Sequence, residues 1–423
     1  MSPNSSTEDR TSASASAPFG LFERYGVELE YMIVDRETLD VRPLADWLLA
    51  DVAGHVTADV ERGAITWSNE LVNHVIEIKL TDPAPALGNL AALFQADVRF
   101  IDERLATRNA MLLPTGAHPW MDPYAETRLW PHEGREVYAL YDRIFDCRGH
   151  GWANLQSAHM NLPFRGDAEF GRLHAAVRVL LPILPALSAS TPVLDSCLSE
   201  FADVRLEVYR HNQDRIPSLT GLVIPEAVFT QADYHARIFA PIQRDIRPYD
   251  TEGVLEHHFL NSRGAIARFD RGAIEIRVLD LQECPAADLA ILELVVATLQ
   301  ALVDEHWTPL AEQQAWSEHD LAPLFNAVIH TAEETPIADA AYLRLLGLRR
   351  QQATAAELWA HLFGEVGSAI TPASRVVLTH LLRHGSLATR IVRALGEAPT
   401  RDALHRVYAR LSTCLHTGTL FTS

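Results

Sequence analysis

The sequence predicts an α+β protein with an antiparallel β-sheet and a helical C-terminal third, and three observations support this fold class. Short segments within the first 285 residues alternate apolar and polar side chains, as half-buried strands do. Amphipathic helical segments lie between them without the regular strand–helix alternation of a parallel sheet. From residue 286 onward, nearly every segment has the periodicity of a helix.

Length and charge set the expected domain organisation and exclude one class of partner. The chain has 423 residues and a net charge of −19, and one hydrophobic core usually stops growing at ~250–300 residues. We expect a disordered tail at 1–18, a catalytic α+β core at 19–285 and a helical part at 286–423 that packs on the same core. The acidic charge argues against nucleic acid as a partner, because nucleic-acid binders present a basic surface.

The predicted strands share one pattern, with apolar residues on one face and polar residues on the other. In Gly26–Val34, Val27 and Leu29 lie on one face, while Glu28 and Glu30 lie on the other. Further strands are expected at His74–Leu80, Ala153–Pro163, Ile266–Phe269 and Ala273–Leu279, the last two joined by an Asp-Arg-Gly turn. Each strand therefore has one face to bury and one that can carry polar groups.

Helices are expected where apolar residues recur every three or four positions. They span Leu87–Asn109, Tyr138–Phe145, Phe170–Leu181, Asp288–Glu305, Ala338–Leu346, Thr354–Phe363, Pro372–Arg383 and Arg401–Leu415. The helix at Asp288–Glu305 is apolar almost all round, which predicts burial in a core or in an interface. The sequence therefore leaves open whether the protein forms a homo-oligomer.

No segment has the pattern of a secretion signal or a membrane span. The first 18 residues lack an apolar stretch, and the best candidate span, Leu289–Val303, contains Glu293 and Gln300 and is shorter than the ~20 residues required. The four cysteines lie far apart, with no CxxC spacing: Cys147, Cys197, Cys284 and Cys414. We expect a cytoplasmic protein with reduced cysteines and no membrane partner.

Polar side chains occur two residues apart on three predicted strands. The pairs are Glu28/Glu30, His159/Asn161 and Glu275/Arg277; Glu77 lies on a fourth strand, and Glu70 precedes it by seven residues. Residues i and i+2 of a strand share a face, so one common sheet would gather these carboxylates. Clustered carboxylates repel one another unless cations compensate. This predicts a site for Mg²⁺, with Mn²⁺ as an alternative that also accepts a histidine.

Each of these residues alone has a simpler interpretation. A single glutamate on a strand is more often solvated than a metal ligand, and a single histidine is more often hydrogen-bonded within the fold. The ordered series of pairs on strands favours a functional interpretation of the whole set.

Arginines form a second series of candidates: Arg205, Arg210, Arg215, Arg263, Arg268, Arg271 and Arg277. Guanidinium groups match phosphates and carboxylates in geometry, although surface ion pairing in an acidic protein is the alternative. The sequence contains no GxxxxGKS/T, GxGxxG, GxSxG or HExxH motif. A bound nucleotide would therefore be held by metal ions and arginines.

Five motifs in fixed order resemble a known family. They are GVELE at 26–30, the segment 70–81 that contains IEIKLT, SAHMN at 157–161, LSASTP at 187–192 and IEIRVLD at 274–280. They resemble the glutamate-cysteine ligase superfamily, and most closely glutamate-cysteine ligase family 2, the bacterial carboxylate-amine ligases. The resemblance implies a glutamine-synthetase-like curved antiparallel sheet of about six strands, with helices packed on its convex side and the site on its concave face.

The resemblance also implies roles for individual residues. The metal ligands would be Glu28, Glu30, Glu70, Glu77, His159 and Glu275. Arg277 and Glu70 would take part in catalysis, and Arg277 would face the phosphates. Further contacts to the nucleotide are expected from Arg205, Arg210 and Arg268, while arginines at 205–215 could also hold a substrate carboxylate.

The implied activity is that of an ATP-dependent ligase with Mg²⁺. It would join glutamate or a similar carboxylate to an amine such as cysteine, through an acyl phosphate, to form a γ-glutamyl amide. Three alternatives stay open at the sequence level: a guanidino-kinase-like phosphotransferase, a metal-dependent amidohydrolase and a non-catalytic nucleotide-binding member of the family.

Overall fold

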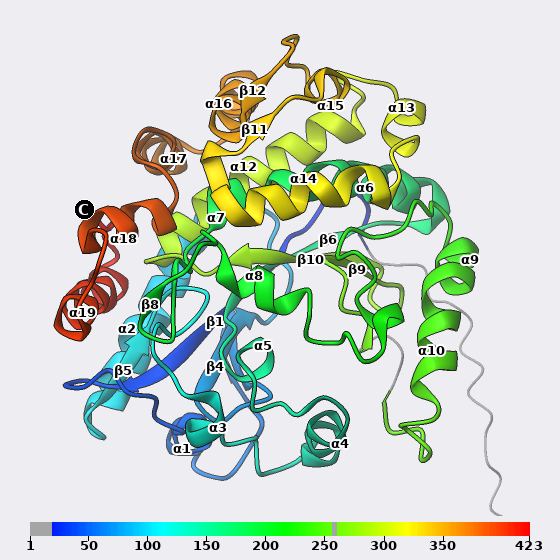
Figure 1. Ribbon diagram of the computed structural model, residues 1–423. Helices are drawn as coiled ribbons and strands as arrows, with labels where there is room; N and C mark the ends of the chain where they lie inside the picture. Colours follow the sequence, from blue (N-terminus) through cyan, green and yellow to red (C-terminus); the bar gives the residue numbers. More distant parts are fainter. Residues whose placement is uncertain (1–18, 256–259) are drawn as a thin grey trace, which may run out of the picture.

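An antiparallel sheet forms the centre of the protein (Figure 1). The computed structural model describes residues 19–255 and 260–423, so the predicted tail at 1–18 lies outside the described residues. Within these residues the sheet has eight strands. Their spatial order is β2 (Asp59–Arg62), β3 (Ile65–Asn69), β4 (Val75–Leu80), β1 (Gly26–Asp35), β6 (Ser157–Pro163), β10 (Ala273–Asp280) and β9 (Ala265–Arg268), and β5 (Ala110–Leu113) pairs with the far end of β1.

The α+β class and the antiparallel sheet are confirmed, but the sheet is larger than about six strands. One added strand, β2, has an alternately exposed and half-exposed polar sequence at the sheet edge. It therefore lacks the apolar face by which strands are identified in a sequence. At β6 the strand begins at Ser157 rather than at Ala153, because the preceding residues form the short helix α5 (His150–Ala153).

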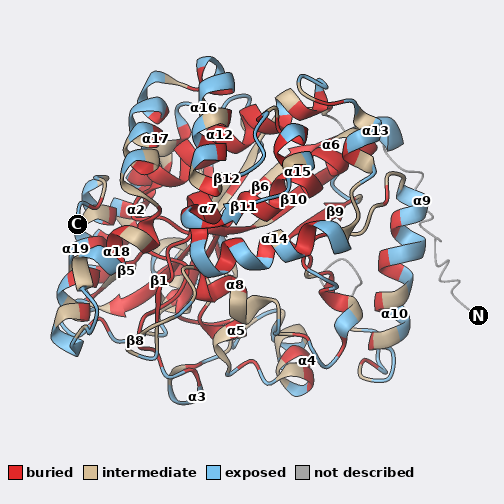
Figure 2. Ribbon diagram, turned by 45° about the horizontal axis from the view of Figure 1, so that its top comes forward, coloured by how far each residue is buried: buried red, intermediate tan, exposed pale blue. Residues whose placement is uncertain are grey.

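Helices α2 (Leu90–Ala106), α6 (Gly166–Leu180) and α12 (Pro285–Val303) cover the apolar face of the sheet. Figure 2 shows the buried residues gathered between these layers. Helix α12 is long and apolar enough to cross a membrane, but 83% of its most apolar window is buried inside the protein. Of the two environments expected for this helix, the core of its own chain is the correct one.

The C-terminal third is helical, as predicted; most of it packs on the main hydrophobic core, and its last two helices pack mainly on a second apolar cluster. Its helices are α13 (Leu310–Gln314), α14 (Glu318–Thr331), α15 (Ala340–Leu345), α16 (Ala355–Val366), α17 (Pro372–His384), α18 (Leu387–Leu395) and α19 (Arg401–Thr417). Both α16 and α17 contact α12, while α19 contacts β5 and α2. This part of the chain thus supports the sheet from behind.

Shorter elements complete the fold around the sheet and its helices. Helices are α1 (Ala45–Ala53), α3 (Pro123–Glu126), α4 (Arg135–Phe145), α7 (Pro185–Ser188), α8 (Val204–Tyr209), α9 (Gln231–Tyr234) and α10 (Ala240–Ile246). Single turns are η1 (Leu181–Ile183), η2 (Pro217–Leu219), η3 (His235–Phe239), η4 (Ala332–Glu334) and η5 (Gly367–Ala369). Two further two-stranded sheets pair β7 (Val193–Leu194) with β8 (Cys197–Leu198) and β11 (Pro336–Ile337) with β12 (Ala353–Thr354).

Candidate active site

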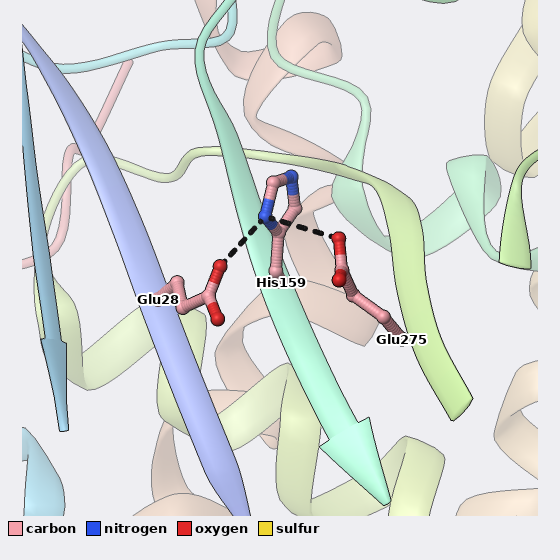
Figure 3. Close-up of side chains that lie close together, drawn as sticks. All are labelled: Glu28, His159 and Glu275. Atoms are coloured by element: carbon pink, nitrogen blue, oxygen red, sulfur yellow. Dashed lines mark hydrogen bonds and ion pairs between the residues drawn. The ribbon is translucent and has the colours of Figure 1, made fainter. Parts of the chain in front are cut away.

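The register of the sheet places the predicted acids on one face. Glu28 lies opposite His159, Glu30 opposite Glu77, and Glu275 opposite Asn161. Directly opposed residues of antiparallel strands project to the same side. Figure 3 shows the His159 side chain between those of Glu28 and Glu275.

Two groups of possible metal ligands share one histidine. Glu28, His159 and Glu275 offer ligand atoms that all lie within 4.8 Å of one another, and Glu30, Glu77 and His159 do the same. His159 Nδ1 lies 3.2 Å from Glu28 Oε2 and 3.9 Å from Glu275 Oε1, while its Nε2 lies 3.8 Å from Glu30 Oε1. Carboxylate oxygens with one imidazole fit Mg²⁺ or Mn²⁺.

The carboxylates of this cluster differ in charge state. Burial, together with the charges of Glu30 and Glu77, raises the pKa of Glu70 well above its ordinary range. Burial and the charge of Glu28 raise the pKa of Glu77 to about 7. Burial also raises the pKa of Glu28, but the hydrogen bond and charge of His159 outweigh it and lower that pKa to about 2.

His159 is a doubly protonated cation in this arrangement. Burial lowers its pKa, but the charge of Glu30 and the hydrogen bond to Glu28 raise it to about 9. The hydrogen bonds agree, because the Ser157 hydroxyl donates to Glu30 (2.9 Å) and so can only accept from His159 Nε2 (2.8 Å). The empty cluster thus carries its own compensating cation, which a metal ion would have to deprotonate.

Three polar neighbours of the acids were not predicted from the sequence. Lys79 lies opposite Glu28 and forms an ion pair with Glu77 (2.5 Å), Ser68 donates to Glu77 (2.5 Å), and the Ser157 backbone N–H donates to Glu30 (2.7 Å). Lys79 and Ser157 each lie two residues from a predicted ligand. The same i, i+2 rule that selected the acids could therefore have selected both.

Two cavities meet at the carboxylate cluster. The first, about 190 Å³, is called here the aromatic cavity and is lined by Glu30, Glu70, Leu71, Tyr138, Tyr141, Gly151, Trp152, Leu155, Ser157, His159, Arg205, Tyr209, Asn212, Gln213, Ser262 and Arg277. The second, about 300 Å³, is called the basic cavity and is lined by Phe19, Arg24, Gly26, Val27, Glu28, Lys79, Leu80, Thr81, Pro83, Asn161, Pro163, Arg271 and Ala273. On each of β1, β6 and β10, site-face residues toward one end line the aromatic cavity, and site-face residues toward the other end line the basic cavity. The two cavities therefore follow one another along these strands.

A β-bulge in β10 adds an acid to the site face. Ile276 pairs with Met160 and Leu279 with Ala158, so three steps along β10 match two along β6. Regular alternation would have turned Asp280 away from Glu275, but the bulge places it opposite Ser157 instead. A bulge cannot be read from an alternating sequence, and Asp280 was not predicted.

Asp280 in turn fixes a predicted arginine. It accepts hydrogen bonds from the Ser190 backbone (2.8 Å) and from the Thr191 hydroxyl (3.0 Å), and it forms a buried ion pair with Arg205. Arg205 is 2% exposed and lines the aromatic cavity.

The structure separates the predicted arginines. Arg277 lines the aromatic cavity, with its Nε 3.0 Å from Glu275 Oε1. Arg268 lies behind this pair, 3.8 Å from Glu275 and 3.1 Å from Asp270. Arg210 is brought to neither cavity: it pairs with Glu207 (2.6 Å) on α8. Of the remaining candidates, Arg271 lines the basic cavity, Arg263 pairs with Glu226 (2.5 Å), and Arg215 donates to a backbone carbonyl.

All four cysteines are free, in agreement with the expectation of reduced thiols. Burial raises the pKa of the Cys147 and Cys284 thiols, which makes them poor nucleophiles. The described cavities that meet at the acids contain no cysteine in their linings.

Comparison with known proteins gives one family. The sequence model of glutamate-cysteine ligase family 2 matches residues 24–410. An uncharacterised protein of Archaeoglobus fulgidus is 34% identical over 281 residues, which are 66% of this chain and 75% of the relative. A Rubrobacter xylanophilus protein provisionally named glutamate–cysteine ligase 2-3 is 30% identical over 202 residues, 46% of this chain and 49% of its own.

A solved structure shares the fold. The crystal structure of glutamate–cysteine ligase from Francisella tularensis in complex with AMP has a TM-score of 0.58 with this chain, at 13% identity. The match covers 93% of this chain and 89% of the other. At this identity the likeness concerns the fold alone, and it agrees with the fold expected from the sequence motifs.

Proposed function

The chain belongs to glutamate-cysteine ligase family 2, a family of amide-bond-forming ligases, and from that premise we propose that it is an ATP-dependent carboxylate–amine ligase. One observation carries the proposal beyond the family. Two cavities of different chemistry meet at a carboxylate cluster whose two ligand groups share His159. Such an arrangement suits the transfer of a phosphoryl group from a substrate in one cavity to a substrate in the other.

The proposed reaction has two steps. The γ-phosphoryl group of ATP moves to a carboxylate of glutamate or a similar substrate and gives an acyl phosphate and ADP. An amine then attacks the acyl carbon, the bond to phosphate breaks, and the amide and inorganic phosphate are released. Bound Mg²⁺ would neutralise the charge that accumulates between the phosphoryl oxygens and the incoming carboxylate.

The basic cavity supports the nucleotide assignment. Arg24, Lys79 and Arg271 line it beside Glu28, so three positive side chains surround one end of the cluster. Phosphates need cations of this kind where no phosphate-binding loop exists. In the proposal Glu28, Glu275 and His159 hold one ion near the β- and γ-phosphates.

The aromatic cavity supports the assignment of the second substrate. Glu30 and Glu70 face it and, with Glu77, would hold a second ion near the reacting carboxylate. The pKa values of Glu70 and Glu77 are raised in the empty site, so each must lose its proton before it can bind a cation. Glu70 would thus be kept neutral until substrate and metal arrive together.

In the proposal, Arg277 faces the phosphoryl group as it passes from one substrate to the other. It follows Glu275 by two residues on β10 and lines the aromatic cavity, so a phosphoryl group held beside Glu275 lies within reach of its guanidinium. Two N–H groups of a guanidinium can bridge two phosphoryl oxygens as charge shifts between them. We assign to Arg277 the stabilisation of the transferring group.

The release of ADP from ATP tests the proposal. We expect release that requires Mg²⁺ or Mn²⁺ and a carboxylate such as glutamate, and a γ-glutamyl amide when an amine from a panel that includes cysteine is added. Phosphoryl transfer that ignores the amine would indicate a guanidino-kinase-like phosphotransferase. Nucleotide binding without ADP release under any combination would contradict a ligase and indicate a non-catalytic member of the family.

A further inference from the structure

Lys79 is the only lysine among the 36 lysine and arginine residues of the chain. Arginine provides the positive charge on the surface, in buried ion pairs and in the cavity walls. The single lysine lies in the candidate site, where it lines the basic cavity. Lysine carries a compact charge on a flexible stem, whereas arginine carries a wide planar group. Lysine at this position therefore points to a role that a guanidinium does not fill.

Lys79 belongs to the site face of β4. It follows Glu77 by two residues, and the register of the sheet places it opposite Glu28 on β1. Its ammonium forms an ion pair with Glu77, whose same carboxylate oxygen also accepts a hydrogen bond from Ser68. The Lys79 side chain is 35% exposed, whereas that of Glu77 is 7% exposed. The lysine thus extends from the buried acids toward the basic cavity.

The two arginines that line the basic cavity have partners away from the acid cluster. Arg24 donates to the backbone carbonyl of Glu23 (2.8 Å), and its Cζ lies 4.9 Å from the centroid of the Phe19 ring. Arg271 is 61% exposed, and its Nε lies 3.9 Å from Asp270. Of these three cations, Lys79 is therefore the one that pairs with a carboxylate of the cluster in the part of the chain that the structure describes.

The ion pair of Lys79 with Glu77 suits the protein without substrates. Glu77 belongs to one of the two groups of possible metal ligands, so Lys79 would share this carboxylate with a divalent cation if it stayed in place. Two cations on one carboxylate repel each other. The flexible stem of Lys79 lets the ammonium turn to another anion. In the proposed function, the anion in the basic cavity is the polyphosphate of the nucleotide.

We propose that Lys79 is a further catalytic residue, whose ammonium leaves Glu77 and contacts the terminal phosphates of the nucleotide. Its three N–H donors rotate about the end of the stem, so they can follow phosphoryl oxygens whose positions change during transfer. One cation then serves two states, because it compensates Glu77 before the substrates bind and the phosphates afterwards. The inference rests on the proposed function, which assigns the nucleotide to the basic cavity.

The first test observes Lys79 directly in the full-length protein. Lysine labelled with ¹³C at Cε gives a single side-chain signal, because the chain contains a single lysine. With Mg²⁺ present throughout, a non-hydrolysable ATP analogue should shift this signal. AMP, which lacks the β- and γ-phosphates, should leave it nearly unchanged. An equal shift with both nucleotides, or no shift with either, would overturn the inference.

The second test compares the binding of the two nucleotides by calorimetry in Mg²⁺. Lys79→Met removes the ammonium, so the Kd of the ATP analogue should rise about tenfold or more, as expected for a lost hydrogen bond between charged groups. The Kd of AMP should change by less than about twofold. Lys79→Arg keeps a charge beside Glu77 and should show the same selective loss to a smaller extent. Arg210→Met removes a cation from an ion pair outside both cavities and is the matched control, expected to bind both nucleotides like the parent.

The outcomes separate this inference from the proposed function. A shift and a rise in Kd that are specific to the ATP analogue, without ADP release under any conditions, would retain the phosphate contact and reject the ligase. ADP release with an unchanged Kd of the ATP analogue in Lys79→Met would reject the phosphate contact and retain the ligase. Equal losses of affinity for the ATP analogue and for AMP would make Lys79 a structural partner of Glu77 and overturn the inference.

Discussion

A single histidine couples the two halves of the candidate site. His159 belongs to both ligand groups, donates to Glu28 through Nδ1 and donates to Ser157 through Nε2. In the empty protein its positive charge replaces part of the charge that metal ions would supply. Glu28, which accepts a hydrogen bond from His159, is therefore stabilised as an anion, whereas burial and neighbouring charges raise the pKa values of Glu70 and Glu77.

This difference predicts opposite stability effects for two glutamates. At pH 7.5 in EDTA, Glu28→Gln should lower the free energy of unfolding by about 1–3 kcal/mol, because the anion paired with His159 is the favoured form. Glu77→Gln should raise it by an amount of the same order, because burial and Glu28 disfavour that anion. Both variants should lose ADP release.

Urea unfolding measures the change in the free energy of unfolding for each variant. The exposed Glu61→Gln is the control, and its free energy of unfolding should lie within about 0.5 kcal/mol of the parent value. Destabilisation by both variants would show that Glu77 is not under repulsion.

Arg277→Lys tests the phosphoryl-facing role. The lysine keeps the positive charge but not the planar fork, so we expect kcat and kcat/KM to fall together by the equivalent of about 2–4 kcal/mol, while ATP binding weakens little. Steady-state ADP release, with circular dichroism to verify folding, measures the effect. Arg210→Lys is the matched control and should retain the rate, since Arg210 pairs with Glu207 away from both cavities. If Arg277→Lys kept the kcat of the parent protein, Arg277 would serve only as an ion-pair partner of Glu275.

At the scale of elements, the bulge in β10 changes which side chains the sheet presents to the candidate site. It turns Asp280 to the site face, where this carboxylate fixes Arg205 in the wall of the aromatic cavity. The bulge is local, but its effect is to connect the sheet with α8. Bulges often serve in this way to re-aim a side chain beside an active site.

Removal of Asp280 should therefore be far more damaging than removal of a surface partner. Asp280→Ala leaves Arg205 buried without its carboxylate, and we expect a loss of about 3–5 kcal/mol in the free energy of unfolding. Asp40→Ala breaks the half-exposed pair with Arg401 and should cost about 1 kcal/mol or less. Chemical denaturation measures both variants. If Asp280→Ala and Asp40→Ala lost the same free energy of unfolding, the Asp280–Arg205 pair would be solvated rather than buried.

For the whole molecule, the empty site makes stability depend on pH. The pKa of Glu77 is raised to about 7 from an ordinary 4.5, so its contribution to stability falls as pH rises from 4.5 to 7. The pKa of His159 is raised to about 9 from 6.5, so the stability that its charge supplies is complete below 6.5 and is lost as pH rises to 9. Both groups act in the same direction across this range.

We therefore expect the Tm of the metal-free protein to fall between about pH 5 and pH 9. The Tm of the Glu77→Gln variant should fall less steeply over the same range, because this variant lacks one of the two titrating groups. Mg²⁺ should raise the Tm most at the alkaline end, because the ligands are then already deprotonated. Thermal unfolding in EDTA and in Mg²⁺ at several pH values measures both effects. An increase in Tm on Mg²⁺ addition that is independent of pH would contradict the assignment of Glu77 and His159 as ligands.

The sequence by itself determined which residues could form the site face. Alternation along β1, β4, β6 and β10 separated the acids from the core residues, and the apolar surface of α12 predicted its burial. Both are periodic properties of one segment, and they depend only on backbone geometry.

Only the tertiary structure decided which of these residues meet. Strand register makes His159 common to both ligand groups, and the bulge adds Asp280 to the site face. Packing of α5 on α8 brings Trp152 and Arg205 to the wall of one cavity, whereas Arg210, five residues later, lines neither cavity. Register, bulges and helix packing depend on contacts between segments distant in the chain. A pattern read along one segment contains no record of them.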